Sequence, residues 1–271
     1  MYSMSPVMLE LKSIRHGFAD SEWTLHISSL SLPPRVLLGI IGPNGSGKST
    51  LLRIAAGVIS PASGKVIMKG RNLSGLSRRF VARHLGYLPQ ETVSLYDFTV
   101  EEIVRLGRYP HARRLGSLDA GDQAVIKQSL QLTEMEALRH RSLSRLSGGE
   151  RKRAFLASVL AQRPEILILD EPTGALDIHH QVRFFRLLRD LSGEGMAVAV
   201  ATHEINLASL FCDSLLILSG GNPLAQGPPG RVLTSSIIHS VYGESVLMGH
   251  HPETDRPALF PRIAKENTRE S

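Results

Sequence analysis

The clearest chemical signal in the sequence is a stretch of nine residues that matches the phosphate-binding pattern G-x-x-x-x-G-K-[ST]: Gly42, Pro43, Asn44, Gly45, Ser46, Gly47, Lys48, Ser49 and Thr50. Glycines allow the backbone to turn sharply, so that successive N–H groups converge on phosphate oxygens. We expect Lys48 to reach the β- and γ-phosphates of a nucleotide, and the Ser49 hydroxyl to ligate Mg²⁺. A glycine-rich turn without a ligand is the alternative, but the match at every fixed position favours a nucleotide site.

Two adjacent acidic residues, Asp170 and Glu171, follow the apolar run at 166–169. An all-apolar run is typical of a strand buried on both faces of a parallel sheet, and ligands bind at the carboxyl end of such strands. We therefore expect Asp170 to hold Mg²⁺ opposite Ser49. Glu171 would polarise the attacking water as a general base. The alternative is a pair of solvent-exposed acids that simply ends the strand.

Two other polar residues also stand just after predicted strands. His203 follows the apolar run at 196–201, and Gln90 follows the run at 85–89. Histidine titrates near neutral pH, so His203 could contact a γ-phosphate and the water that attacks it. Gln90 alone would be an ordinary loop residue, and its interest comes from its spacing to the motifs that follow.

Phe18 lies between two segments that alternate like strands. Its ring could stack on adenine, because stacking needs a flat aromatic face and no particular hydrogen bond. It could equally be a partly buried aromatic residue in a hairpin. The residues around it do not decide between these two interpretations.

The pentapeptide Leu-Ser-Gly-Gly-Glu at 146–150 is a second diagnostic stretch. Ser147 and Glu150 have the spacing of a capping box at the start of a helix. Gly148 and Gly149 weaken a helix start unless something must approach the backbone closely. An anion held by the N–H groups and the Ser147 hydroxyl would be such a group, and an ordinary glycine-rich loop is the alternative.

The apolar periodicity predicts an α/β fold, with a helix that follows the phosphate loop and is closed by Gly57. A short run that ends at a turn is typical of a strand. The predicted strands are 7–12, 23–27, 36–41, 65–68, 85–89, 166–169, 196–201 and 215–218, and the helix after the loop is 51–56.

Residues from about 91 to 146 are predicted to form a helical insertion. Capping boxes at Thr99 and Thr133 each predict a helix start. The segment is basic, and we expect its arginines to form a solvated face, with partner docking as the alternative. These arginines are Arg105, Arg108, Arg113 and Arg114.

We divide the chain into one domain at 7–245, with its core at 7–90 and 147–245, and a tail at 246–271. The tail is rich in proline and charge, and from about residue 250 onward we expect it to be loosely held.

Composition sets outer limits on function. The 271 residues are 42% hydrophobic, so the chain can bury a substantial core, and no apolar run is long enough to cross a bilayer. The single cysteine, Cys212, excludes an intramolecular disulfide, and ordinary packing is its expected role. The net charge of +6 is compatible with a partner that is nucleic acid, polyphosphate or an anionic membrane surface, and it does not distinguish among the three.

In this order the motifs resemble an ABC-type ATPase cassette over roughly residues 7–240. The correspondences are the Walker A loop at 42–50, the Q-loop at Gln90, the signature at 146–150, Walker B with its glutamate at 166–171, the D-loop at 175–177, the switch histidine at His203, and the adenine-stacking aromatic at Phe18.

The resemblance implies a P-loop NTPase core with a mostly parallel sheet, an N-terminal antiparallel β subdomain and an inserted α-helical subdomain. It implies ATP and Mg²⁺ as cofactors, with Gln90 at the metal beside Ser49 and Asp170, and in catalysis beside Glu171 and His203. Two copies would pack about a twofold axis, which such a self-complementary pairing requires. Each phosphate loop would then face the partner's signature. The nucleotide-contacting residues outside the loop would be Phe18, Ser147, Gly148, Gly149, Glu150 and Asp177.

The segment at 98–111, with Gly-Arg-Tyr-Pro at 107–110, and the C-terminal segments 241–243 and 251–257 resemble one subgroup of the family. These are ATPases of bacterial importers for iron–siderophore complexes, haem and cobalamin. The resemblance implies two transmembrane permease subunits, an extracytoplasmic substrate-binding protein, the cytoplasmic face of the inner membrane, and no nucleic-acid partner.

An iron–siderophore or related metal chelate is the expected cargo, with haem and vitamin B12 as alternatives. A soluble ABC ATPase for DNA maintenance or Fe–S assembly is the rival from another class. Sustained heptads, which the coiled coil of a DNA-repair head requires, are missing between the loop and the signature.

Overall fold

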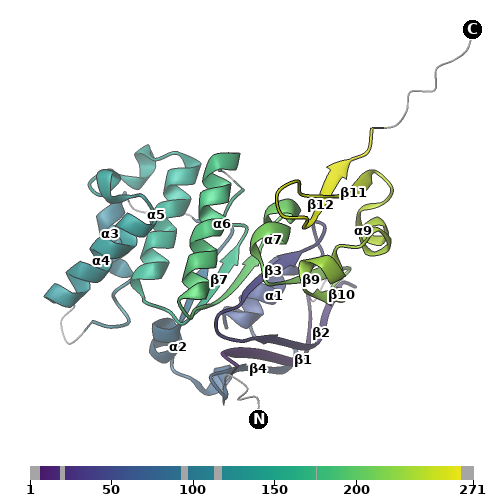
Figure 1. Ribbon diagram of the computed structural model, residues 1–271. Helices are drawn as coiled ribbons and strands as arrows, with labels where there is room; N and C mark the ends of the chain where they lie inside the picture. Colours follow the sequence, from purple (N-terminus) through teal and green to yellow (C-terminus); the bar gives the residue numbers. More distant parts are fainter. Residues whose placement is uncertain (1–6, 19–21, 93–96, 113–117, 175, 264–271) are drawn as a thin grey trace, which may run out of the picture.

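A six-stranded, mostly parallel sheet lies at the centre of the protein, in the order β10–β9–β3–β8–β7–β6 (Figure 1). The computed structural model describes residues 7–18, 22–92, 97–112, 118–174 and 176–263. The strands are β3 (Leu37–Ile41), β6 (Leu85–Leu88), β7 (Ile166–Asp170), β8 (Ala197–Ala201), β9 (Ser214–Ser219) and β10 (Asn222–Gly227). β10 pairs antiparallel with β9, and the other neighbours pair parallel, so the predicted fold class is confirmed.

The apolar runs form strands because both faces of this sheet are covered. Every residue of β3, β7 and β8 is buried. Successive side chains on a strand point to opposite faces, so Leu38 and Ile40 join one hydrophobic cluster and Leu37 and Ile41 join the other. This is why these strands are continuously apolar and do not alternate with polar residues.

An antiparallel sheet in the order β2–β1–β4–β5 covers one side of the core, and it confirms the predicted N-terminal β subdomain. Its strands are β1 (Leu9–Gly17), β2 (Thr24–Leu32), β4 (Ser63–Met68) and β5 (Arg71–Asn72). Helix α1 (Lys48–Ala55) packs in the same cluster as this sheet and the central one, through Leu51, Leu52 and Ile54. The start of α1, which is the end of the phosphate loop, is therefore held from both sides.

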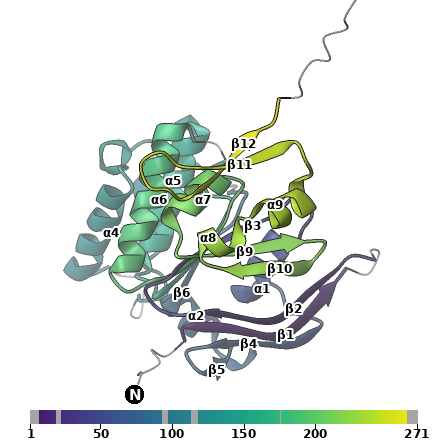
Figure 2. The ribbon, with the colours of Figure 1, turned by 45° about the vertical axis from the view of Figure 1, so that its right-hand side comes forward.

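The other face of the central sheet is covered by helices (Figure 2). They are α5 (Gly148–Ala161), α6 (Ile178–Gly193), α7 (Ile205–Phe211), α8 (Pro229–Val232) and α9 (Ser235–Tyr242). Phe185 of α6 is fully buried there, in contact with Phe211 at a ring-centroid distance of 5.9 Å.

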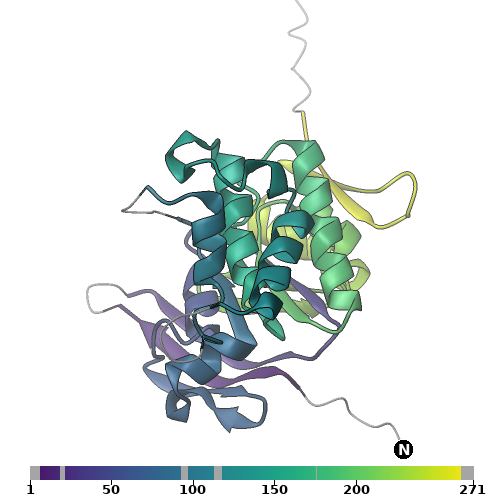
Figure 3. The same cartoon turned by 90° about the vertical axis from the view of Figure 1, so that its left-hand side faces the viewer.

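A helical region lies beside the sheet core, as the predicted fold class requires, and it faces the viewer in Figure 3. It contains α3 (Val100–Leu106) and α4 (Ala120–Leu132), and α2 (Arg78–His84) precedes it. Its hydrophobic cluster also includes Ala154, Ala157 and Ala161 of α5. Helix α5 therefore belongs to both parts, because one side of it packs on the helical region and another on the sheet.

The capping box predicted at Thr133 is wrong. Thr133 ends α4, and its Oγ1 donates a hydrogen bond to the Ser129 carbonyl at 2.9 Å. The capping box that starts this helix is formed by two aspartates: Asp119 Oδ1 accepts from the Asp122 N–H at 2.9 Å, and Asp122 Oδ2 accepts from the Asp119 N–H at 3.2 Å. The box at Thr99 is confirmed, with both of its hydrogen bonds present at the start of α3.

The prediction that these arginines form a solvated face is wrong for Arg108. Arg113 and Arg114 lie outside the described residues. Arg108 is 7% exposed, and its Nε donates to Asp122 Oδ1 at 2.8 Å. Its guanidinium also donates to the Ala161 carbonyl at the end of α5, at 2.6 Å. This buried ion pair joins the turn that follows α3 to α4 and α5. Arg105, one turn earlier, is exposed as expected.

The predicted loosely held tail is also wrong as far as residue 263. β11 (Val246–His250) and β12 (Pro257–Pro261) form an antiparallel hairpin, seen at the top of Figure 2. Asn206 of α7 binds both backbone groups of Leu259, at 3.1 Å and 2.8 Å, and Ser209 donates to the Pro257 carbonyl at 2.6 Å. Side-chain hydrogen bonds from α7 thus hold a segment whose proline content suggested disorder.

In the part of the chain that the structure describes, no helix has the length and apolar character needed to cross a membrane.

Replacing Arg108 by alanine is expected to destabilise the protein by about 3 kcal/mol, because the buried Asp122 carboxylate loses its partner. Chemical denaturation at neutral pH measures the free energy of unfolding. Arg105→Ala is the matched control, since it removes an exposed arginine from the same segment and should change stability little. Equal losses in the two variants would contradict a structural role for the ion pair.

Candidate functional site

The phosphate loop bends through glycine conformations that other residues rarely adopt. Gly42, Gly45 and Gly47 have φ angles of +153°, +75° and +102°. A Cβ at Gly42 would lie 2.2 Å from the Leu218 carbonyl oxygen, so a side chain there has no room. Gly47 is the N-cap of α1 and no side chain caps this helix. The N–H groups of its first turn are therefore available to an anion.

Lys48 lies inside the loop and not on the surface. Its side chain is 5% exposed, and its Nζ donates to the Gly42 carbonyl at 2.9 Å and to the Pro43 carbonyl at 3.2 Å. Burial lowers the pKa of Lys48, and the carboxylates of Glu171 and Asp170 oppose that shift. The Glu171 carboxylate oxygen Oε1 lies 4.0 Å from this ammonium group.

Asp170 is fully buried at the end of β7, where its Oδ1 accepts a hydrogen bond from Ser49 Oγ at 2.9 Å. Its second oxygen, Oδ2, is buried without a hydrogen-bond partner among the described residues. Burial raises the pKa of Asp170, and the hydrogen bond from Ser49 opposes that shift. An unpaired buried carboxylate oxygen costs free energy, so it is expected to have a partner in the working protein.

Polar side chains from other parts of the chain surround the carboxylate of Glu171. Its carboxylate accepts a hydrogen bond from Gln90 Nε2 at 2.8 Å and lies 2.6 Å from His203 Nε2. Gln90, Glu171 and His203 follow β6, β7 and β8, which are neighbours in the sheet, and this adjacency brings the three side chains together. The backbone of Glu171 has a φ of +45°, a strained conformation for a residue with a side chain.

A cavity of about 370 Å³ opens over the loop. It is lined by Phe18, Trp23, Asn44, Gly45, Gly47, Lys48, Ser49, Thr50, Gln90 and Glu171. Phe18 is 53% exposed, and its ring stacks on the ring of Trp23 with 6.0 Å between the two ring centroids. Trp23 was not among the predicted site residues. Its position just before β2, close after Phe18, is a signal in the sequence that could have indicated it. Its place beside Gly47, where an added Cβ would lie 2.7 Å from the ring, depends on the fold.

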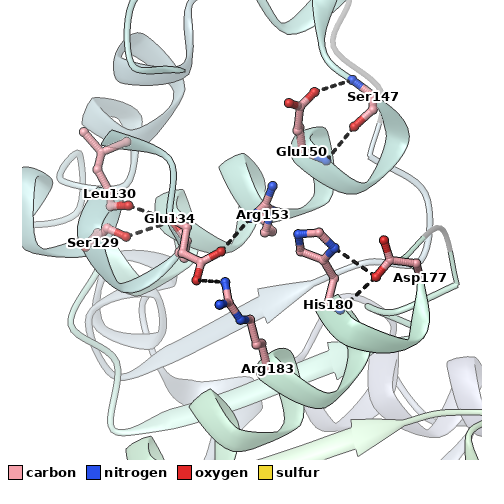
Figure 4. Close-up of polar contacts among 10 residues, drawn as sticks. Ser129, Leu130, Glu134, Ser147, Glu150, Arg153, Asp177, His180 and Arg183 are labelled. Atoms are coloured by element: carbon pink, nitrogen blue, oxygen red, sulfur yellow. Dashed lines mark hydrogen bonds and ion pairs between the residues drawn. The ribbon is translucent and has the colours of Figure 1, made fainter. Parts of the chain in front are cut away.

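The signature residues and Asp177 are not among the described residues that line this cavity, and Figure 4 shows Ser147 and Asp177 at the starts of two helices. Of the described residues that line the cavity, none comes from 147–150. Ser147 starts α5 with the predicted capping box: its N–H donates to Glu150 Oε2 at 2.8 Å, and its Oγ accepts from the Glu150 N–H at 3.2 Å. Asp177 caps α6, accepting from the His180 N–H at 2.9 Å and contacting His180 Nδ1 at 3.0 Å.

An ion-pair cluster between these two helices was not predicted. Glu134 lies 3.1 Å from an Arg153 guanidinium nitrogen on α5 and 2.7 Å from one of Arg183 on α6 (Figure 4). Glu134 therefore bridges the helical region and the helix that Asp177 starts. The three side chains are far apart in the sequence, so no local pattern signals the contact.

A glycine loop at a helix N-terminus, a buried aspartate beside its serine and a following glutamate together define a P-loop nucleotide-binding protein. The family model described as ABC transporter matches residues 25–174, and the chain belongs to that family.

Relatives with curated names support the assignment. The hemin import ATP-binding protein HmuV of Pseudomonas entomophila is 40% identical over 260 residues, which are 94% of this chain and 100% of that protein. The ferric enterobactin transport ATP-binding protein FepC of Escherichia coli K12 is 37% identical, covering 86% of each chain. The cobalamin import ATP-binding protein BtuD of Halobacterium salinarum is 38% identical over 83% of this chain, which spans 56% of the length of that relative.

Solved structures share the fold. A metal-chelate-type ABC transporter in an inward-facing conformation matches with a TM-score of 0.81 and 25% identity, over 95% of this chain and 98% of that chain. A bacterial ABC transporter cassette solved as a dimer matches with a TM-score of 0.73 and 28% identity, over 82% of this chain and 98% of that chain.

Gly42→Ala is expected to destabilise the protein by about 2 kcal/mol or more, because the new Cβ meets a backbone carbonyl and the φ angle is strained. Gly45→Ala is the matched control. Its φ is also positive, but a Cβ there meets nothing within 4 Å, so it should cost about 1 kcal/mol. Urea denaturation of both variants measures the difference, and similar losses would argue against close packing at Gly42.

Proposed function

We propose that this chain is the ATP-binding and ATP-hydrolysing subunit of a bacterial ABC importer that takes up an iron–siderophore or related metal chelate through separate permease subunits. The observation that carries the ATPase assignment is the convergence on Glu171. One carboxylate faces Lys48 of the phosphate loop, Gln90 and His203, at 4.0, 2.8 and 2.6 Å. The order of the strands brings these positions together, and the polar side chains that stand there are of the kinds that nucleotide hydrolysis uses.

ATP is the proposed ligand of the cavity over the loop. Backbone N–H groups of the glycine loop and of the first turn of α1, together with the Lys48 ammonium, supply positive partners for its phosphates. Phe18 lines the same cavity, which supports its role as a stacking surface for the adenine.

Mg²⁺ is the proposed metal, with Ser49, Asp170 and Gln90 as its candidate ligands. The donor set is made of hydroxyl, carboxylate and amide oxygens, which suits this hard cation. Asp170 Oδ2 is buried and has no hydrogen-bond partner in the described part of the chain, and Ser49 Oγ lies 2.9 Å from its other oxygen, so an acceptor and a hydroxyl already converge. When bound, the metal would neutralise charge on the transferring phosphoryl group.

Glu171 is the proposed general base for the attacking water. Its carboxylate is 17% exposed and borders the cavity, so it combines access to water with fixed orientation. Gln90 orients it through the 2.8 Å hydrogen bond. His203 lies on its other side, where it would contact the γ-phosphate and the water.

A second copy of the chain is the proposed partner at the nucleotide. Among the described residues, Ser147, Gly148, Gly149 and Glu150 lie outside the cavity of their own chain, which supports a role in closing the site of another copy. In this arrangement Asp177, exposed at the start of α6, would also lie at the interface. The same face would serve both copies, which is the condition for twofold symmetry.

Two transmembrane permease subunits complete the proposed importer, and an extracytoplasmic binding protein would deliver the cargo. The chain would lie at the cytoplasmic face of the inner membrane without touching nucleic acid. The named functions of the relatives support this assembly and leave the cargo among siderophore, haem and cobalamin. We also keep the division into a domain at 7–245, with a helical insertion at about 91–146, and a tail at 246–271 as a proposal.

Glu171→Gln should nearly abolish ATP hydrolysis while leaving ATP binding intact, and should trap an ATP-dependent dimer on size exclusion. The amide keeps the shape of the side chain but cannot take a proton from water. Lys48→Ala is the contrasting variant, because losing a cation that faces two phosphates weakens ATP binding itself. A monomer of Glu171→Gln in saturating ATP would contradict the two-copy site.

The cargo is tested by deleting the gene and supplying one iron or cobalt source at a time. Growth is expected to fail on an iron–siderophore and to continue on haem or cobalamin. Failure on haem or cobalamin alone would select the alternative cargo. Co-purification distinguishes the rival class: recovery of the tagged chain with a detergent-solubilised permease supports import, whereas recovery with DNA would contradict it.

A further inference from the structure

Lys152 is a buried cation that the proposed chemistry does not use. Its side chain is 8% exposed, and it lies in the second turn of α5, the helix that starts at the signature. Lysine is rarely this buried unless its charge has partners. Burial lowers the pKa of Lys152, and the carboxylates of Asp170, Glu171 and Glu91 oppose the shift.

The direct partners of Lys152 are backbone carbonyls at the end of β6. Its Nζ donates to the Pro89 carbonyl at 3.2 Å and to the carbonyl of Gln90. These two contacts fix the backbone from which the Gln90 side chain projects. The Gln90 amide in turn donates to Glu171, so three residues form a continuous path from α5 to the proposed base.

The other end of this path is the helix start that would face a second copy. Ser147 and Lys152 are five positions apart on one helix, which is about 7.5 Å along its axis. A helix transmits a displacement of its first turn to its second because its backbone hydrogen bonds keep it rigid. A change at Ser147 therefore displaces the Lys152 ammonium relative to the carbonyls that it holds.

We propose that Lys152 is a positioning residue that couples the two nucleotide sites of a dimer. When the signature of one copy contacts the nucleotide, Lys152 of that copy shifts the positions of Gln90 and Glu171 in the same copy. The inference rests on the proposed function, in which that signature contacts the nucleotide held by the other copy. ATP bound to one copy then sets the geometry of the glutamate that acts on the ATP of the second copy.

A purely structural role would be to satisfy two carbonyls beyond the end of β6. Such a role affects the free energy of unfolding, but it does not make one nucleotide site respond to the other. Cooperativity in ATP concentration separates the two roles. In two coupled sites the Hill coefficient of hydrolysis rises above one, to about two at most.

The test compares the full-length wild type with Lys152→Met and Lys152→Arg, using ATPase rate against ATP concentration. Methionine keeps the length and removes the donor, so kcat is expected to fall about tenfold, the effect of losing a charged hydrogen bond. The Hill coefficient should fall to one. Lys152→Arg keeps a cationic donor and is expected to retain the cooperativity. ATP affinity, measured by equilibrium titration, should stay within about twofold in each variant, because Lys152 does not line the cavity.

Lys127→Met is the matched control, because Lys127 is an exposed lysine on the neighbouring helix α4. Lys152→Leu is measured in parallel, so that a folding defect specific to methionine leaves a second neutral variant that also lacks a donor. Cooperativity that persists in the neutral variants, or that is lost equally in Lys152→Arg, overturns the coupling. A wild type that hydrolyses ATP without cooperativity also overturns it. A wild type that neither dimerises with ATP nor hydrolyses it shows instead that the proposed function itself has failed.

Discussion

The candidate site depends on the adjacency of three parallel strand ends. Because β6, β7 and β8 are neighbours, the residues that follow them share one edge of the sheet, and Glu171 meets Gln90 and His203 there. The backbone of Glu171 is strained at this contact, because its φ of +45° is unfavourable for a residue with a side chain. Strain of this kind persists only where the surrounding structure holds the residue in place, and the neighbouring strands β6 and β8 and the phosphate loop do so.

The phosphate loop is positioned by the same principle of two-sided support. Helix α1 packs between the antiparallel sheet and the central sheet, so the N–H groups at its start have a fixed direction. Lys48 and Asp170 are at most 5% exposed, and burying a charged group in the protein interior costs free energy. Their shifted pKa values, lowered for Lys48 and raised for Asp170, both arise from burial. A bound nucleotide with its metal would supply counter-charges for both groups, which explains why two charged side chains are buried here.

The helical region is joined to this core by charge as well as by packing. Arg108 with Asp122 joins the turn that follows α3 to α4 and α5, Glu134 bridges α5 and α6, and Lys152 holds the backbone beside Gln90. Each contact includes α5, whether through a side chain or through its last carbonyl. The helix that begins with the signature is therefore also the element through which the helical region reaches the edge of the sheet where Gln90 and Glu171 lie.

The sequence by itself determined the features that depend on near neighbours in the chain. The phosphate loop, the capping boxes at Thr99 and Ser147, and the continuously buried strands all follow from local spacing, and the structure contains each of them. Only the tertiary structure decided what depends on distant partners. The burial of Arg108, the place of Trp23 over Gly47 and the hydrogen bonds that α7 makes to the hairpin β11–β12 are of this kind. Burial and pairing across the fold depend on which elements pack together, and no pattern of spacing within one element contains that information.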